Sequence, residues 1–166
     1  ISEVNNKKIR ILFSAHSLPV SIIKSGDPYQ WQVQQTVLSV MKGISGVEDY
    51  VVCYQSKVTP VKWLEPSTPD EIKRAIKDDV AIIIVPIAFV SDHSETLVEL
   101  DIEYKNLAKE MGSKEYYRIE ALNINETFIE GLKDLVMESK QIDTTNNIST
   151  KICPKTFKEC YHNYNE

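Results

Sequence analysis

Hydrophobic and polar positions divide the chain into segments that are strand-like and helix-like in turn. Short continuous runs of apolar, β-branched residues predict buried strands, whereas apolar residues spaced three and four positions apart predict amphipathic helices. The predicted strands are residues 9–15, 49–56, 80–90 and 116–123, and the predicted helices are residues 31–44, 71–78, 93–112 and 126 to about 140. Thr68 is expected to cap the second helix with Pro69 at its first position, and Gly112 is expected to end the third.

Strand and helix therefore alternate four times, and the strands are apolar throughout rather than at every second position. Strands of this kind are buried on both faces, as in a parallel sheet with helices packed on each side. The predicted fold class is α/β: a Rossmann-like, doubly wound parallel four-stranded sheet with helices on both faces. Residues 9–140 are expected to form this domain, residues 1–8 an N-terminal extension, and residues 141–166 a polar linker with a cysteine-containing tail.

The composition fits one globular domain and argues against several classes of protein. With 166 residues, 42% of them hydrophobic and 26% charged, the chain is long enough to bury a core. Its formal net charge of −5 argues against nucleic acid as a partner, because phosphate binding needs a basic surface. No apolar stretch approaches the roughly 20 residues of a membrane span. Three cysteines without an export signal do not indicate a disulfide framework, and a cytoplasmic location is expected.

Titratable residues follow two of the predicted strands at the points where they end. The first strand is followed by His16, and the third by residues 92–95, which read Asp-His-Ser-Glu. Ligands of open parallel sheets bind beyond the carboxyl ends of the strands, so we expect His16 and Glu95 to face each other there. A histidine opposite a carboxylate suits proton transfer near neutral pH. The alternative for His16 is an ordinary loop or capping histidine.

Glu95, Glu99 and Glu103 follow at four-residue spacing, so that they lie along one face of the predicted helix. Like charges at this spacing destabilise a helix, and only Glu95 is close enough to the N-terminus to be favoured by the helix dipole. A row of carboxylates that begins at a cleft could relay protons or hard divalent cations. The alternative is a solvated helix face.

Three aromatic residues lie near these groups in the sequence. Trp63 occupies a loop bounded by prolines, Phe89 precedes the Asp-His-Ser-Glu turn, and Trp31 begins the first predicted helix. Each of them could simply fill the core. A cleft lined by Trp63 and Phe89, with histidine and glutamate at its base, would instead suit a flat aromatic ligand.

Three long motifs resemble one known family. They are FSAHSLPVSIIKSGDPY at 13–29, YQSKVTPVKWLEPST at 54–68 and VPIAFVSDHSETLVELDIEY at 85–104. In this order they are similar to the C-terminal half of ferrochelatase, and the similarity extends over about residues 9–137. The resemblance implies a fold of two Rossmann-like lobes with a porphyrin cleft between them. It also implies insertion of Fe²⁺ into protoporphyrin IX, with release of two protons, to give protohaem.

The resemblance also implies roles for individual residues. The family's catalytic histidine and its paired carboxylate correspond to His16 and Glu95. Positions linked to metal or proton passage correspond to His93, Glu99 and Glu103, which together with His16 and Glu95 form the expected metal-binding set. Trp63 and Phe89 correspond to residues that line the porphyrin pocket. Fe²⁺ is accordingly expected as a substrate rather than as a resident cofactor.

The chain departs from the family pattern at three places. The family's N-terminal lobe is absent, so the chain is expected to be the C-terminal half, with that lobe and protoporphyrin IX as partners. Thr59 and Glu65 occupy loop positions where the family commonly has glycine, and either change could shift Trp63. The tail holds only Cys153 and Cys160, whereas the [2Fe–2S] cluster of some relatives needs four ligands, so free thiols are expected instead.

Two alternative functions stay open at this point. One is a related tetrapyrrole chelatase that uses Co²⁺ or Ni²⁺, and the other is a non-catalytic module that binds porphyrin or haem. The implied substrate is apolar, so peripheral contact with a membrane is also expected. The expected location is the cytoplasm, or the mitochondrial matrix if the source is eukaryotic.

Overall fold

The computed structural model describes residues 8–141 and 153–160. Its elements in chain order are β1 (Ile9–His16), α1 (Val20–Ser25), α2 (Tyr29–Lys42), β2 (Tyr50–Gln55), α3 (Thr68–Lys77), β3 (Ala81–Pro86), the π-helix η1 (Glu95–Glu103), α4 (Tyr104–Glu110), β4 (Tyr116–Arg118) and α5 (Glu126–Gln141). The predicted alternation of strand and helix is therefore confirmed. Within the described residues no helix has both the length and the apolar character that a membrane span requires.

The four strands form one parallel sheet in the order β2-β1-β3-β4. β1 pairs with β2 on one side and with β3 on the other, and its residues from Arg10 to Ala15 are buried. This explains the continuous apolar pattern, because side chains on both faces of an inner strand are removed from water. His16 ends the strand, at the edge of the sheet where its side chain becomes accessible.

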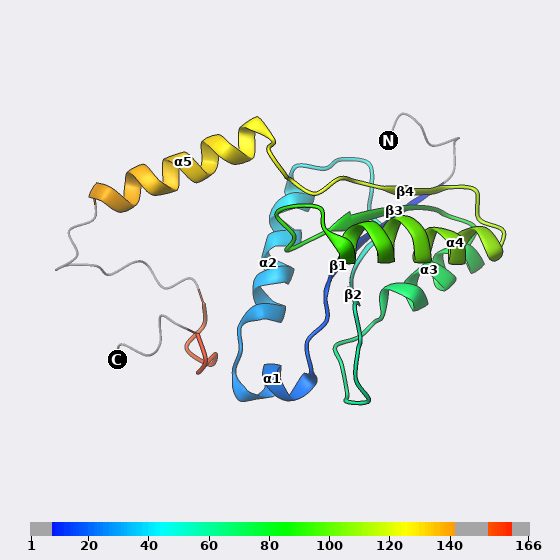
Figure 1. The fold of residues 1–166 in the computed structure, drawn as a ribbon, viewed down its shortest axis with the longest axis horizontal. Coiled ribbons are helices and arrows are strands. Elements are labelled where there is room, and N and C mark those ends of the chain that lie inside the picture. The colour runs from blue at the N-terminus through cyan, green and yellow to red at the C-terminus, as the bar shows by residue number, and fades with distance from the viewer. Residues whose placement is uncertain (1–7, 142–152, 161–166) are drawn as a thin grey trace.

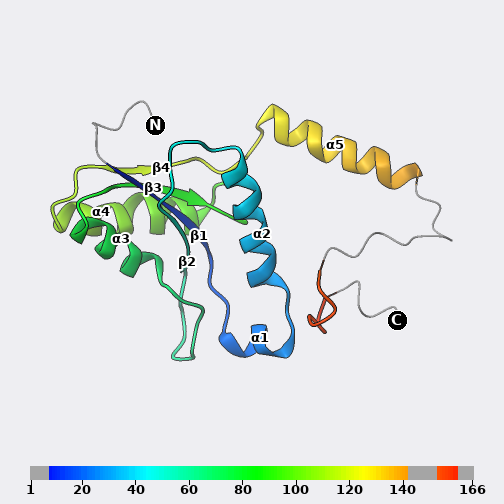
Figure 2. The same ribbon diagram turned by 180° about the vertical axis from the view of Figure 1, so that it is seen from behind.

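Helices cover both faces of the sheet, as predicted (Figure 1). On one face Ile11, Phe13 and Ala15 of β1 pack with Val33 and Val37 of α2. On the other face one cluster joins β1 to α3, η1 and α4, and its buried members are Leu12, Cys53, Ile72, Ala75, Ile82, Ile84, Leu100, Tyr104 and Ala108. Figure 2 shows the same separation of α2 from α3 and α4 from behind. Successive residues of β1 thus pack into the two cores in turn. Each fully buried aliphatic side chain stabilises the folded state by about 1.5–3 kcal/mol.

Several element boundaries differ from the predictions for local reasons. The third strand ends at Pro86 rather than 90, because Ala88 adopts a positive φ of 65° and turns the chain away. β4 is correspondingly short, because its last paired residue, Arg118, lies opposite Ile84 near the end of β3. Helix α1 was not predicted, since its six residues are too few to show a helical period.

The cap of α3 is Ser67 rather than Thr68. The Ser67 hydroxyl accepts a hydrogen bond from the Asp70 N–H at 3.2 Å, and Pro69 consequently occupies the second helical position. Thr68 is instead fully buried, with its hydroxyl 2.8 Å from that of Ser14 in β1. The prediction was wrong by one residue; both adjacent residues are N-cap types, and serine is the better of the two.

The predicted helix 93–112 forms as two parts, the π-helix η1 followed directly by α4. Gly112, with φ of 88°, lies just past the end of α4, near where the sequence predicts the helix to end. A π-helix is rare and is frequent at functional sites. Here it contains the whole row of Glu95, Glu99 and Glu103.

Helix α5 extends away from the sheet and its covering helices in both views (Figures 1 and 2). Several of its large apolar side chains are exposed: Ile129, Leu132, Leu135, Val136 and Met137. The exposed fraction of Leu135 reaches 62%. Apolar residues at helical spacing on an exposed face are typical of a surface that packs against another part of a protein.

Candidate active site

His16 lies at the carboxyl end of β1, and one of its two ring nitrogens is already hydrogen-bonded. Its Nδ1 is 2.7 Å from the carbonyl oxygen of Ser17. A carbonyl only accepts, so Nδ1 must be the protonated nitrogen and donate, which leaves the Nε2 lone pair free in the neutral ring. Nε2 is 3.7 Å from Oε1 of Glu95, which confirms the predicted proximity of the two residues.

The backbone around His16 is fixed by two further hydrogen bonds. The Tyr29 hydroxyl of α2 donates to the His16 carbonyl at 2.9 Å, and the Ser17 N–H donates to the Gln55 carbonyl at 2.9 Å. Burial, followed by the nearby Tyr54 and Glu95, raises the pKa of Tyr29 to about 12. The Tyr29 hydroxyl therefore stays protonated and continues to donate throughout the neutral range.

Glu95 begins η1 and is positioned through its main chain. Its N–H donates to Nδ1 of His93 at 3.2 Å, and its carbonyl accepts from the Gln55 amide at 3.0 Å. The side chains of His16 and Glu95 remain 37% and 40% exposed, so both are accessible from outside the lobe. A free imidazole lone pair beside an accessible carboxylate can accept a proton or share a divalent cation.

Glu99, the next residue in the acidic row, is in a different environment. Its carboxylate accepts four hydrogen bonds, from the Ser56 N–H at 3.1 Å, the Ser56 hydroxyl at 2.7 Å, the Gln55 amide at 3.3 Å and the Tyr104 hydroxyl at 3.0 Å. Burial and then the charge of Glu99 raise the pKa of Tyr104, which keeps that donor protonated. Glu99 therefore joins η1 to the loop after β2, where Ser56 has a positive φ of 62°.

The five residues of the predicted metal set do not come together as one ligand group. In the described ranges, no three histidine, cysteine or carboxylate side chains are arranged to hold a metal ion. His16 and Glu95 are the pair in contact, Glu103 is exposed at the end of η1, and His93 is exposed with its ring 5.2 Å from that of Phe89. The metal roles of these residues stay predictions.

A buried network of polar side chains connects β1 and β2 to the residues of the site, and it was not predicted from the sequence. The Ser14 hydroxyl of β1 donates to the Gln55 side-chain oxygen at 2.8 Å and lies 2.8 Å from the hydroxyl of Thr68. Gln55 then reaches both the Glu95 carbonyl and Glu99 through its amide nitrogen. The signal for it was present, because Ser14 and Gln55 are polar residues within strands that are otherwise apolar.

A second network fixes the loop between β3 and η1. Arg118 of β4 donates to both oxygens of Asp101, at 2.6 and 2.7 Å, and to Asp92 at 2.8 Å. The Asn123 amide donates to Asp92 at 3.1 Å and accepts from the Asp92 N–H at 2.9 Å. Burial opposes ionisation of Asp92, but Asn123 and Arg118 outweigh it and hold the pKa of Asp92 below its usual value. The turn that leads to Glu95 is therefore held by charge-assisted hydrogen bonds.

The three aromatic residues of the sequence analysis have different surroundings. Trp63 is partly exposed, its main chain pairs with Pro19 just after β1, and its ring N–H donates to the Thr59 carbonyl at 2.8 Å. Thr59 supplies only a backbone carbonyl, which glycine would also supply. Phe89 is half-buried against His93. Trp31 does not join them, and its ring centroid lies 5.9 Å from that of Phe157 in the tail.

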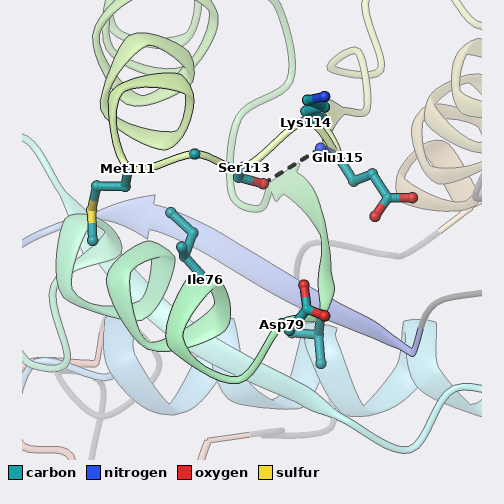
Figure 3. Close-up of a pocket in the computed structure, with 8 residues that line it drawn as sticks. Ile76, Asp79, Met111, Ser113, Lys114 and Glu115 are labelled. Carbon is teal, nitrogen blue, oxygen red and sulfur yellow. Dashed lines mark hydrogen bonds between the residues drawn. The ribbon is translucent and has the colours of Figure 1, made fainter.

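A cavity of about 470 Å³ lies at the opposite edge of the sheet, where β3 and β4 begin (Figure 3). Its lining includes Ile76, Asp79, Met111, Ser113, Lys114 and Glu115. The Glu115 N–H donates to the Ser113 hydroxyl at 3.4 Å. Ligands of parallel sheets bind beyond the carboxyl ends of the strands, so this cavity is not part of the candidate active site.

Comparison with known proteins shows the family of this chain. The family model described as Ferrochelatase matches residues 1–140. The ferrochelatase of Pelagibacter ubique is 48% identical over 158 residues, which are 93% of this chain and 46% of that protein. The ferrochelatase of Rickettsia felis is 48% identical over 161 residues, or 94% of this chain and 46% of that protein. That of Caulobacter vibrioides is 52% identical over 131 residues, or 79% of this chain and 38% of that protein.

The chain thus spans about half the length of the curated relatives it matches. Its parallel α/β lobe, with the histidine–carboxylate pair at the carboxyl edge of the sheet, and the match over residues 1–140 lead to one assignment. The chain belongs to the ferrochelatase family of metal chelatases.

Proposed function

We propose that this chain is the C-terminal half of a ferrochelatase, a lyase that inserts Fe²⁺ into protoporphyrin IX and releases two protons to give protohaem. The observation that supports this most strongly is the accessible Nε2 of His16, 3.7 Å from the Glu95 carboxylate at the carboxyl edge of the sheet. The similarity to ferrochelatases over most of the chain supports Fe²⁺ as the metal and protoporphyrin IX as the porphyrin.

The chemistry of insertion fits this pair. Each pyrrole N–H that loses its proton needs an acceptor, and the free Nε2 lone pair of the His16 ring can accept one. Fe²⁺ must be held loosely enough to be transferred to four porphyrin nitrogens, and one imidazole with one carboxylate make a weak, open ligand set. His16 and Glu95 therefore accept protons and present the metal, while Trp63 and Phe89 line the face on which the porphyrin lies.

The second lobe of the relatives would complete the site. The side chains of His16 and Glu95 are open to solvent, and the apolar residues Leu97, Val98 and Ile102 of η1 are also exposed. A reaction that distorts an apolar macrocycle needs a binding site that encloses it. We therefore assign the other wall of the cleft to the amino-terminal half that the relatives possess, with α5 packing against it.

The domain limits and location follow the same proposal. The proposed limits are residues 9–140 for the lobe, 1–8 for an N-terminal extension and 141–166 for a linker and tail; residues 1–7, 142–152 and 161–166 lie outside the described residues. The enzyme works in the cytoplasm and contacts membranes only peripherally, where its apolar substrate partitions.

A metal and porphyrin screen on a completed enzyme tests the proposed function. The chain would be joined to the amino-terminal half of the Pelagibacter ubique relative and assayed anaerobically with protoporphyrin IX and Fe²⁺, Co²⁺ or Ni²⁺. Turnover with Fe²⁺, seen as the change in porphyrin absorbance, is expected. Turnover confined to Co²⁺ or Ni²⁺ would indicate another chelatase, and tight porphyrin binding without turnover would indicate a binding module. Either result would contradict the proposal.

A further inference from the structure

The tail segment 153–160 lies against the turn that joins α1 to α2 (Figures 1 and 2). The Glu159 N–H donates to the Gly26 carbonyl at 3.2 Å. The ring of Phe157 packs on that of Trp31 in the first turn of α2, with their centroids 5.9 Å apart. A backbone hydrogen bond and an aromatic contact thus attach the tail to the residues on either side of the turn. This segment lies outside the residues that the family model matches.

The fit between the tail and the turn is close at Gly26. Gly26 has φ of 109°, and a Cβ there would lie 2.7 Å from the Lys158 nitrogen, so this approach requires glycine. Beside it the Gln32 amide of α2 donates to the Cys153 sulfur at 3.5 Å. Cys153 and Cys160, at the two ends of the segment, are both buried and free. These contacts fix the position of the tail relative to the turn.

The same turn positions Tyr29, the first residue of α2. Asp27, the neighbour of Gly26, accepts a hydrogen bond from the Tyr29 N–H on Oδ1 at 2.8 Å. The Tyr29 side chain packs against the core cluster on this face of the sheet, and its hydroxyl donates to the His16 carbonyl at 2.9 Å. A continuous series of contacts therefore runs from the tail through the turn to the backbone of His16.

The hydrogen bond from Tyr29 bears on how the His16 ring is oriented. The His16 carbonyl and the Ser17 N–H belong to one peptide group, which Tyr29 holds from one side and the Gln55 carbonyl from the other at 2.9 Å. The Ser17 carbonyl in turn accepts from Nδ1 of His16 at 2.7 Å. The direction in which Nε2 points toward Glu95 consequently depends on this peptide group.

We propose that Tyr29 is a positioning residue for His16, and that the docked tail segment 153–160 holds Tyr29 in place. Tyr29 acts through the backbone of His16 and does not itself contact the metal or the porphyrin. The role in turnover rests on the proposed function, because the orientation of Nε2 matters there only if His16 takes part in metal insertion. The tail of the chain is thereby a supporting part of the site.

The ring-nitrogen signals of His16 in nuclear magnetic resonance spectra of the full chain test the positioning without any turnover. At alkaline pH, where imidazoles are neutral, the parent is expected to show an Nδ1-protonated ring, as the hydrogen bond to Ser17 requires. Tyr29→Phe removes only the hydroxyl, and Phe157→Ala removes the aromatic contact. Each is expected to shift the signals toward those of a ring that exchanges between its two tautomers. Lys155→Ala, at an exposed position of the same segment, is the control and should keep the parent signals.

Steady-state kinetics show whether the positioning serves turnover. The chain is joined to the amino-terminal half of its Pelagibacter ubique relative and assayed for Fe²⁺ insertion. Tyr29→Phe is expected to lower kcat about fivefold, since one hydrogen bond is lost, with KM for protoporphyrin IX little changed. Phe157→Ala is expected to lower kcat as well. The double variant is expected to be no slower than Tyr29→Phe alone, because the tail acts through the Tyr29 hydroxyl.

Two results would overturn the inference, with the folding of each variant checked by circular dichroism. The first is a set of His16 signals that Tyr29→Phe or Phe157→Ala leaves as in the parent. The second is losses of kcat that multiply in the double variant, which would mean that the tail acts by another route. Absence of turnover in the parent would instead contradict the proposed function, and the His16 signals would then decide the positioning role alone.

Discussion

Residues of the acidic row are used in different ways although the sequence makes them look equivalent. The Glu95 side chain is 40% exposed and faces His16, whereas the Glu99 carboxylate is saturated by four donors from β2, its following loop and α4. The spacing of the row could be predicted from the sequence. The partners of Glu99 could not, because Gln55 and Ser56 lie 44 and 43 residues away in the sequence and reach Glu99 only through the fold.

Replacing Glu99 or Glu95 by glutamine distinguishes a structural carboxylate from an accessible one. Glu99→Gln removes the charge from a carboxylate that accepts four hydrogen bonds, so the free energy of unfolding should fall by about 1–3 kcal/mol. Glu95→Gln changes an accessible side chain and should alter that free energy by no more than about 0.5 kcal/mol. Urea denaturation of both variants measures the difference. Equal losses in the two variants would mean that Glu95 is also a structural carboxylate.

Asp92 gives the stability of the lobe a defined pH dependence. Its pKa is lowered in the folded protein, so it stabilises the fold above its unfolded pKa of about 4, and this contribution is lost as the pH falls through the folded pKa. Asp92→Asn should therefore cost about 1–3 kcal/mol at pH 7, where Arg118 loses an ionised partner. The difference between the two proteins should shrink as the pH drops below about 4. A difference independent of pH in urea denaturation would contradict this.

At the scale of elements, the hydrophobic pattern predicted every strand and most helices, and the errors have local causes. Helix α1 is too short to show a period, and β3 ends at Pro86 because Ala88 turns the chain. The π-helical form of η1 could not be predicted, because its apolar residues fit an α-helix equally well. Polar Ser14 and Gln55 within apolar strands indicated a buried polar network, but its partners could not be predicted because the hydrogen bonds join residues of three elements.

The cap of α3 provides a direct check on one corrected boundary. Ser67→Ala removes the side-chain acceptor of the Asp70 N–H and should cost about 1 kcal/mol of unfolding free energy. Thr68→Ser, which keeps the buried hydroxyl beside Ser14 and loses only a methyl group, is the control for the neighbouring position. If Ser67→Ala were neutral in thermal denaturation, Ser67 would not be the stabilising cap.

The exposed apolar side chains of helix α5 allow a test of how this chain packs against the other half of the protein. Leu135 is 62% exposed in this chain, so Leu135→Ala should change the stability of the chain alone by no more than about 0.5 kcal/mol. In the protein joined to the amino-terminal half of a relative, the same change should cost about 1–3 kcal/mol, because the side chain becomes buried. Met111→Ala, at the opposite edge of the sheet, is the control and should behave alike in both proteins. Equal effects of Leu135→Ala in both would show that α5 does not pack on the other half.

At the scale of the whole molecule, the chain is one lobe that spans 46% of the length of its Pelagibacter and Rickettsia felis relatives. Its described residues form two cores, one on either side of the sheet. The side chains of its candidate active site, His16 and Glu95, are open to solvent. We therefore expect this lobe to hold its fold by these cores, and we expect turnover in the joined protein.

We propose that His16, together with Glu95, takes part in metal insertion by the joined protein. The initial rate of anaerobic Fe²⁺ insertion into protoporphyrin IX, compared between the joined protein and its His16→Ala variant, tests this role, with porphyrin affinity measured in parallel by fluorescence. We expect turnover in the parent and a loss on the order of 100-fold or more in the variant, with porphyrin affinity nearly unchanged. Insertion by His16→Ala at the parent rate would contradict the assignment of the site.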